Sequence, residues 1–380
     1  MRRLYLENCT ISDLEQFEYG GCYTSPFRLA LQSSCGQCMT VTALSRYTGT
    51  EAPTIRFRLV REGNRDKPIY ASNLYPIGRL NEPTRQQWRV PPMFHASLHT
   101  EIEVVIPEGT KLYLTHFHNT YGDPDRDNGV GIRFNAHLGL KGCAPANTRP
   151  AVELAAKCGF STCIINPKEI ADGELVCIHD PYIDSTARDA HGNPADDHRL
   201  IYEMTWPEIN RWDYGLQKDE LFRGVGILKL EEFFEICSKT GVKPMFSAHE
   251  DALRISGWLR IKQMLEQYGL TKQLHVKSPC MDVLETAFDL FEDGIDSYTL
   301  DHYAPEQMKR SALSDAKCRK VIEVRSVNLH SRDEVQRVLD QGFTFSVAAG
   351  PNTLEPYSRL IDWGVTEFTV NYHCSVGLNW

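Results

Sequence analysis

The hydrophobic and polar positions follow two different patterns along the chain, and the change occurs near residue 130. Before it, the segments 54–60, 101–106 and 111–118 alternate in hydrophobicity or are apolar over the length of a strand, and turn formers such as 107–109 separate them. Several short strands without a long amphipathic helix predict an all-β sandwich over residues 1–130. We regard this domain as a candidate for binding a ligand or a carbohydrate.

From residue 131 onward, short apolar runs alternate with segments of helical periodicity. We expect strands at 132–136, 161–165, 174–178, 243–248, 273–277, 297–300, 320–324, 343–347 and 366–370. We expect helices at 150–158, 230–239, 251–268, 281–291, 331–341 and 354–363. This alternation predicts an α/β domain over residues 131–380, folded as a closed (β/α)₈ TIM barrel.

The composition is typical of a globular protein and argues against binding to nucleic acid. Of the 380 residues, 42% are hydrophobic and 24% are charged, and the net charge of −9 is spread along the chain without acidic or basic blocks. No segment approaches the roughly 20 apolar residues of a membrane span, and the first residues lack the apolar stretch of a signal peptide. We therefore expect a cytoplasmic protein, and the sequence leaves its oligomeric state open.

The twelve cysteines are scattered, and several lie in apolar stretches where small buried hydrophobic side chains are common. Cys35 and Cys38 have the spacing of a redox or zinc motif, but no second pair follows them. We expect reduced thiols, as in other cytoplasmic proteins.

Polar side chains follow nearly every predicted strand of the barrel. In a TIM barrel the reacting groups gather at the carboxyl ends of the strands. The residues at these ends are His137, Asn166, His179, Asp180, His249, Glu250, Lys277, Ser278, Asp301, His302, Arg325, Asn371, Tyr372 and His373. The carboxyl end of the barrel is therefore the predicted site.

Several short motifs occur in a fixed order along the barrel sequence. His137-Leu-Gly is followed by Ala-Pro-Ala-Asn-Thr at 144–148, by Asp172-Gly173 and by His179-Asp180. Later matches lie at 205–215, 228–232 and 364–371. Over roughly residues 132–375 the chain resembles the glycerophosphodiester phosphodiesterases. The resemblance implies a TIM barrel and the hydrolysis of a phosphoric diester by a pair of histidines.

The sequence departs from this family where a divalent metal is bound. In the family two carboxylates after the second strand and a Glu in a later Glu-x-Lys motif hold the metal. Our alignment places Ile164, Asn166 and Ala248 at these positions, while Leu138 and Glu250 replace an Arg and the Lys. Ca²⁺ and Mg²⁺ require several oxygen ligands, which Ile and Ala cannot supply. We therefore predict no metal and no cofactor.

The resemblance implies that His137 and His179 act as general base and general acid on a small-molecule phosphodiester or a glycan-like substrate. The remaining residues predicted to bind substrate are Asp180, Lys141, Glu250, His249, Lys277, Asp301, Arg325 and Asn371. Among these, Lys141, Lys277 and Arg325 are candidates to compensate the phosphate charge in place of a metal.

Three alternatives stay open at this point. The two histidines could be structural, in a barrel that binds a phosphodiester or a glycan without turnover. Asp180 and Glu250 could be the carboxylate pair of a carbohydrate-active enzyme. A relocated zinc site could be built from His137, His249, His302 and His373.

Overall fold

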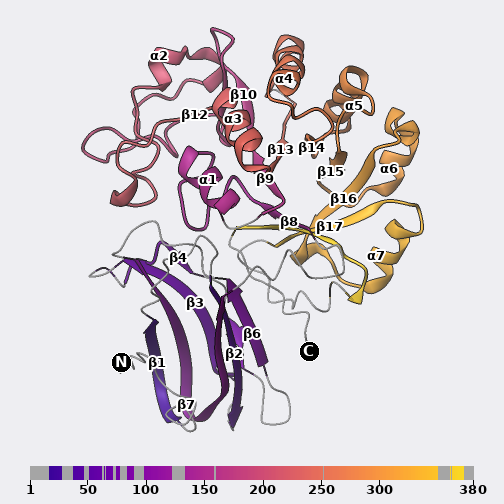
Figure 1. Ribbon diagram of the computed structural model, residues 1–380. Coiled ribbons are helices and arrows are strands. Elements are labelled where there is room, and N and C mark those ends of the chain that lie inside the picture. Colours follow the sequence, from indigo (N-terminus) through magenta and orange to yellow (C-terminus); the bar gives the residue numbers. More distant parts are fainter. Residues whose placement is uncertain are drawn as a thin grey trace. The chain divides into compact units, whose positions relative to one another are not determined.

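The computed structural model describes residues 17–27, 37–46, 51–61, 64, 66–71, 74–77, 84–89, 98–121, 133–157, 160–250, 252–349, 360 and 362–371. The described residues fall into two compact units, one formed by the strands before residue 122 and one formed from residue 133 onward (Figure 1). Cys35, Tyr372 and His373 lie outside the described residues, as does most of the predicted helix 354–363.

The first unit is an antiparallel sheet of seven described strands with the path β4-β3-β7-β2-β6, to which β1 and β5 add (Figure 1). The strands are β1 (Phe17–Phe27), β2 (Gln37–Arg46), β3 (Thr54–Arg61), β4 (Tyr70–Ala71), β5 (Tyr75–Pro76), β6 (Thr84–Arg89) and β7 (Leu98–Tyr121). The described strands join in one sheet, so the second layer of a sandwich stays a prediction. The same holds for the binding role of this domain.

Strand β7 corrects one sequence expectation. Residues 101–106 and 111–118 were expected to be separate strands, but both belong to one strand of 24 residues. The predicted turn at 107–109 is instead an irregularity, because the pairing with β1 shifts between Tyr19 and Gly21. Strands β3 and β2 pair with successive halves of β7, and β1 pairs with β7 on both sides of Pro107.

The second unit contains the predicted barrel. Its strands close in the order β13-β14-β15-β16-β17-β18-β8-β9, all in parallel pairs. They are β8 (Arg133–Ala136), β9 (Thr162–Ile165), β13 (Lys243–Ser247), β14 (His275–Ser278), β15 (Ser297–Leu300), β16 (Arg319–Arg325), β17 (Thr344–Ala349) and β18 (Glu367–Val370). The TIM-barrel prediction is confirmed.

The main helices of this unit are α1 (Arg149–Lys157), α3 (Leu230–Thr240), α4 (Ile255–Gln267), α5 (Met281–Phe291), α6 (Pro305–Arg310) and α7 (Arg332–Leu339) (Figure 1). Each amphipathic helix buries one apolar face, as in α3, where Phe233 and Phe234 are fully buried. The sequence did not predict α6, because six residues beginning with Pro305 are too short to show a helical period.

One predicted barrel strand belongs elsewhere. The segment 174–178 contains β11 (Leu175–Cys177), which pairs with β10 (Pro167–Glu169) and β12 (Leu228–Lys229) in a small antiparallel sheet. This strand lies outside the barrel because β10 directly follows β9, and β11 turns back to pair with β10 in antiparallel fashion. His179 and Asp180 therefore follow a strand of this small sheet and not a barrel strand.

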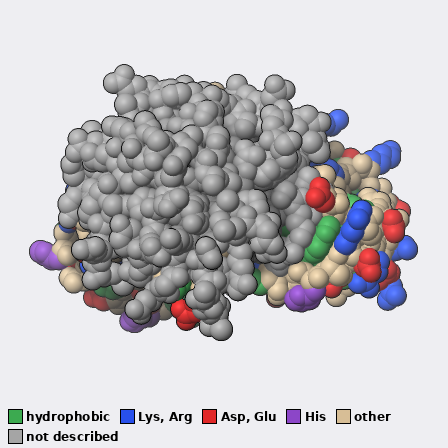
Figure 2. Space-filling view, turned by 90° about the horizontal axis from the view of Figure 1, so that it is seen from below, with side chains coloured by type: hydrophobic (Ala, Val, Ile, Leu, Met, Phe, Trp, Pro, Cys, Tyr) green, Lys and Arg blue, Asp and Glu red, His purple; other side chains and the backbone are tan. Residues whose placement is uncertain are grey.

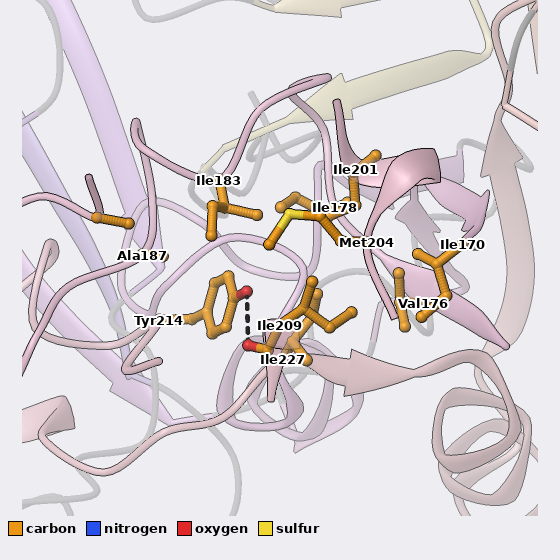
Figure 3. Close-up of a cluster of buried hydrophobic side chains, with 11 residues drawn as sticks. Ile170, Val176, Ile178, Ile183, Ala187, Ile201, Met204, Ile209, Tyr214 and Ile227 are labelled. Atoms are coloured by element: carbon orange, nitrogen blue, oxygen red, sulfur yellow. Dashed lines mark hydrogen bonds between the residues drawn. The ribbon is translucent and has the colours of Figure 1, made fainter. Parts of the chain in front are cut away.

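Between β11 and β12 the chain forms an inserted lobe, residues 178–227, with the short helix α2 (Trp206–Ile209). Figure 3 shows that its side chains gather into a core of their own together with Ile170 and Val176. The Tyr214 hydroxyl satisfies its buried position by donating to the carbonyl oxygen of Ile209 at 3.0 Å. This core fixes the segment that carries His179.

The barrel interior is unusually polar. Glu367 of β18 and Arg319 of β16 form an ion pair although β17 lies between their strands, so both side chains cross the interior. Side chains alternate along a strand, and residues in register share a face. The strand pairs therefore place Asn135, Ser247 and Lys277 on the inner face as well.

The described surface is mixed in charge. Figure 2 shows one face of the molecule, and on its described part Lys and Arg side chains are interspersed with Asp and Glu side chains. Within the described residues, no helix has the length and apolar character needed to cross a bilayer. Six of the cysteines in the described ranges are free thiols, namely Cys143, Cys163, Cys177, Cys237, Cys280 and Cys318.

Candidate active site

His137 lies at the carboxyl end of β8, where its Nδ1 is 2.8 Å from Oδ1 of Asn371. Its backbone N–H donates to the carbonyl oxygen of Val370, so both contacts tie it to the end of β18. An amide oxygen only accepts, and therefore the ring donates through Nδ1–H and keeps the lone pair on Nε2. Burial lowers the pKa of His137 to about 3, and the charges of Lys141 and Lys277 act in the same direction. The ring is neutral at pH 7.

The loop after His137 is held in a strained conformation. Leu138 and Gly139 both have positive φ angles, of 55° and 71°. The Gly139 N–H donates to the Ile164 carbonyl oxygen of β9 at 3.0 Å. A Cβ atom at Gly139 would lie 2.5 Å from the Cβ of Ala151 and 2.7 Å from its carbonyl carbon. The glycine thus allows α1 to approach the loop that positions His137.

This close approach leads to a first prediction. We expect Gly139→Ala to lower the free energy of unfolding by roughly 2 kcal/mol, because α1 cannot move away without losing its core contacts. The matched control is Gly173→Ala, where φ is 82° but nothing lies within 4 Å of the added methyl group. That variant should lose only the backbone term of about 1 kcal/mol. Urea unfolding measures both, and equal losses would contradict the tight contact.

His179 is oriented by its neighbour in sequence. Its Nδ1 lies 2.6 Å from Oδ1 of Asp180, and the Ser185 hydroxyl donates to the second oxygen of that carboxylate. Burial raises the pKa of Asp180, but the hydrogen bonds from His179 and Ser185 outweigh it and lower the pKa below its ordinary value. Asp180 accepts from Nδ1–H of His179, and this contact fixes the orientation of the ring. The His179 side chain is 54% exposed, so its Nε2 edge is accessible to a ligand.

A further imidazole, that of His249, lies beside the His179 ring. The rings of His179 and His249 are 6.3 Å apart between centroids and meet edge to face at 82°. Strand register places Ser247 on the inner face of β13, and His249 follows two residues beyond it. The inserted lobe and the barrel therefore each contribute one of these two histidines.

The same register corrects our alignment at the expected metal site. Ser247 faces the interior at the end of β13, next to the position where the alignment had placed Ala248, and His249 and Glu250 follow the strand as exposed residues. A one-residue slip reverses the faces of a strand, and the sequence alone does not fix it. The inner position at this strand end thus carries Ser247.

The residues around this position do not fit a Ca²⁺ or Mg²⁺ ion. Asn166 Oδ1 accepts from Asn147 Nδ2 at 3.1 Å, and Asn166 Nδ2 donates to the Ser247 carbonyl oxygen at 2.9 Å. Ile164, on the same face, is fully buried and supplies no oxygen. In the described part of the chain no three His, Cys, Asp or Glu residues gather closely enough to hold a metal. The amides satisfy one another and leave no carboxylate for a hard cation.

Lys277 is committed to a network inside the barrel. Its ammonium group forms ion pairs with Glu323 and, at 3.2 Å, with Oδ2 of Asp301. Glu323 also accepts from the hydroxyls of Ser346 and Thr369. Burial alone lowers the pKa of Lys277, but the two carboxylates raise it above its ordinary value. For Asp301, burial dominates and raises the pKa. The effect of Lys277 on the pKa of His137 is therefore electrostatic and involves no hydrogen bond between the two side chains.

Lys141 and Arg325 are placed differently. Lys141 is half-buried in the loop after His137, and burial followed by the charges of Lys218 and Arg325 lowers its pKa. Arg325 is exposed at the carboxyl end of β16. Lys218, which sequence reasoning did not select, comes from the inserted lobe and donates to the carbonyl oxygens of Lys141 and Gly142.

An open cavity of about 1040 Å³ adjoins the histidines through His249. Its remaining lining residues are Glu250, Pro279, Cys280, Met281, Glu285, His302, Gln307, Arg310 and Ser311. The predicted residues His249 and Glu250 therefore lie on its wall. Burial, followed by the effect of Glu250, raises the pKa of the Cys280 thiol. Sequence reasoning missed Cys280, Glu285 and Arg310, because Cys280 precedes α5 and the other two lie on α5 and α6, where helical periodicity marks the buried face and not the residues that line a cavity.

Comparison with solved structures agrees with the barrel topology. The chain is similar to a glycerophosphodiester phosphodiesterase from Agrobacterium tumefaciens, with 17% identity and a TM-score of 0.52 over 63% of this chain and 96% of that one. The barrel has the glycerophosphodiester phosphodiesterase fold. A phosphodiesterase from Oleispira antarctica, solved with the product sn-glycerol-3-phosphate, shares 21% identity at a TM-score of 0.53 and covers 64% of this chain and 95% of its own.

A third structure, described as a putative glycerophosphoryl diester phosphodiesterase from Silicibacter pomeroyi, gives 18% identity and a TM-score of 0.53, and it covers 63% of this chain and 90% of that chain. No protein-family model and no curated protein sequence matches the chain. At this level of identity the similarity establishes the fold, and the chemistry has to be argued from the residues of the site.

Proposed function

We propose that this protein cleaves a small-molecule phosphodiester by acid–base catalysis between His137 and His179, without a divalent metal at the usual position. The observation that carries the proposal is the hydrogen-bonding pattern that the two rings share. Each Nδ1 is fixed by an oxygen acceptor, Asn371 in one case and Asp180 in the other. Both Nε2 atoms are therefore left for the substrate, as paired acid–base catalysis requires.

The two environments assign opposite roles to the two rings. His137 is neutral and can take the proton of an attacking water through Nε2. Asp180 orients His179 through Nδ1, so that the protonated ring can donate its Nε2 proton to the departing alcohol oxygen. The new P–O bond to water forms as the P–O bond to the alcohol breaks. The two rings then exchange one proton through solvent and return to their starting states.

A second candidate is a phosphodiester-binding barrel without turnover. A pKa of about 3 makes His137 a weak base, which favours this candidate. A bound phosphodiester opposes this effect, since its negative charge stabilises the protonated ring. The carbohydrate-active alternative has less support, because Asp180 is already engaged by His179 and Ser185.

Turnover tests the proposal. Bis(p-nitrophenyl) phosphate and a panel of glycerophosphodiesters are assayed with and without EDTA. We expect EDTA-resistant activity that falls at least about a hundredfold in His179→Ala. The control is His191→Ala, because His191 is an exposed residue of the same lobe.

The outcomes separate the candidates. Activity abolished by EDTA would contradict a metal-independent mechanism. Absence of turnover together with thermal stabilisation by a glycerophosphodiester would favour the binding protein. Equal activity of His179→Ala and wild type would remove His179 from the mechanism.

A further inference from the structure

Three cationic side chains lie at the carboxyl end of the barrel on the same side as His137. Lys141 is on the loop that follows His137, and its N–H contacts the His137 carbonyl oxygen at 3.4 Å. The next residue, Gly142, donates its N–H to the carbonyl oxygen of Asn371, the residue that holds the His137 ring. The loop therefore places Lys141 against the His137–Asn371 pair.

Lys218 reaches the same loop from the inserted lobe. Its ammonium group donates to the carbonyl oxygens of Lys141 at 2.9 Å and Gly142 at 3.0 Å. A lysine has three N–H donors, so one stays available for a further acceptor. This contact also brings a second positive charge to the loop.

Arg325 completes the group from β16. Arg325 follows Glu323 by two residues and so lies on the same inner face of β16. It is in register with Ala348 of β17, and Ala348 is in register with Thr369 of β18. Asn371 follows Thr369 by two residues on the same face, so Arg325 lies at the height of the barrel mouth. The electrostatic effect of Arg325 on Lys141 agrees with this placement.

Two of the three cations form no ion pair. Within the described ranges, neither Lys141 nor Arg325 has a carboxylate within the 4.0 Å of an ion pair, whereas Lys277 has two such partners. Asp301 and Asp219 act electrostatically on Arg325 and Lys218 and compensate part of their charge. An anionic ligand relieves the repulsion that remains between the cations.

We propose that Lys141, Lys218 and Arg325 form a phosphate-binding site that compensates the ligand charge in place of a metal ion. The proposal rests on the proposed function and names the group of the substrate that this part of the site holds. A singly charged phosphodiester has two free oxygens, and the planar guanidinium of Arg325 can bind both. The ammonium groups add point charges next to His137. The site therefore takes phosphodiesters and phosphate monoesters through the same chemistry.

Binding measured apart from turnover tests this site. Calorimetric titrations with inorganic phosphate and with glycerol 3-phosphate are made on wild type, Lys141→Ala, Arg325→Ala and the double variant. We expect each single variant to bind about tenfold more weakly, as for loss of one charge-assisted hydrogen bond. Lys141→Arg keeps the charge and should retain most of the affinity. The matched control is Lys239→Ala, because Lys239 is an exposed lysine paired with Glu235 on α3.

The arms of the experiment distinguish this inference from the proposed function. His179→Ala should lose turnover, while its phosphate binding should still weaken when Lys141 and Arg325 are replaced. Loss of binding in the double variant with retention in Lys239→Ala supports the site. Unchanged binding in the double variant, or no binding of either probe to wild type, overturns it, whatever the turnover assay gives. A preference for glycerol 3-phosphate over inorganic phosphate would support an esterified ligand in the same site.

Discussion

Replacement of Glu323 by alanine is expected to lower the free energy of unfolding by roughly 3–5 kcal/mol, because it leaves the Lys277 ammonium group buried without its main partner. The Lys277 side chain is 6% exposed and that of Glu323 is fully buried. Asp301, the other partner of Lys277, lies 3.2 Å away and is 30% exposed, so it compensates only part of the lost charge. Urea unfolding measures the loss.

Two comparison variants separate the loss of the buried ion pair from the loss of any glutamate. Glu306→Ala removes an exposed glutamate of α6 and should change stability by less than about 0.5 kcal/mol. The double variant Glu323→Leu with Lys277→Met replaces the ion pair by apolar side chains of similar size, and it should recover most of the stability. A loss below 1 kcal/mol in Glu323→Ala would mean that Lys277 is solvated, contrary to its burial.

The protein is expected to lose roughly 4 kcal/mol of folding stability between pH 7.5 and pH 5. Burial lowers the pKa of His275 to about 4 and that of His137 to about 3, from an ordinary value of 6.5. A histidine with a lowered folded-state pKa contributes stability that is complete above pH 6.5 and is lost as the pH falls toward the folded-state value. Each ring contributes about 2 kcal/mol over this interval.

His275 has a specific environment at the amino end of the barrel. Ser297 Oγ and Arg319 face its Nδ1, while its Nε2 lies 3.2 Å from Oδ2 of Asp296. Lys243 and Glu367 are the other charged groups whose fields act on the ring. Burial outweighs the two carboxylates because Arg319 and Lys243 already engage them.

Urea unfolding at several pH values tests this prediction. His275→Gln and His137→Asn should each remove about half of the loss, and His191→Gln, at an exposed position, should leave it unchanged. Stability that is constant from pH 7.5 to pH 5 would show that both rings accept a proton in the folded protein.

The two ends of the barrel divide structure and chemistry. The amino end carries the buried network around His275, Arg319 and Glu367, which ties strands together. The carboxyl end carries His137, His179 and the cations of the proposed phosphate site. This division is the one expected for a TIM barrel, where the carboxyl end carries the reacting groups.

Particular residues show how far sequence reasoning extends. Alternating strand and helix periods predicted the barrel, because these patterns depend on residues that are close in sequence. The short motifs around His137 and His179 selected both histidines as candidate site residues, because these motifs also depend on residues that are close in sequence. The strand at 174–178 was recognised as a strand, but its place outside the barrel depended on its pairing with β10 and β12.

The sequence by itself determined the alternation of strands and helices, the closed parallel barrel and the place of His137 at the carboxyl end of its first strand. Only the tertiary structure decided that Ser247 faces the interior, since register depends on neighbouring strands. It also joined Lys218 to a loop 77 residues earlier in the chain and Lys277 to a glutamate 46 residues later. Such contacts depend on chain closure over long loops, which no local pattern encodes.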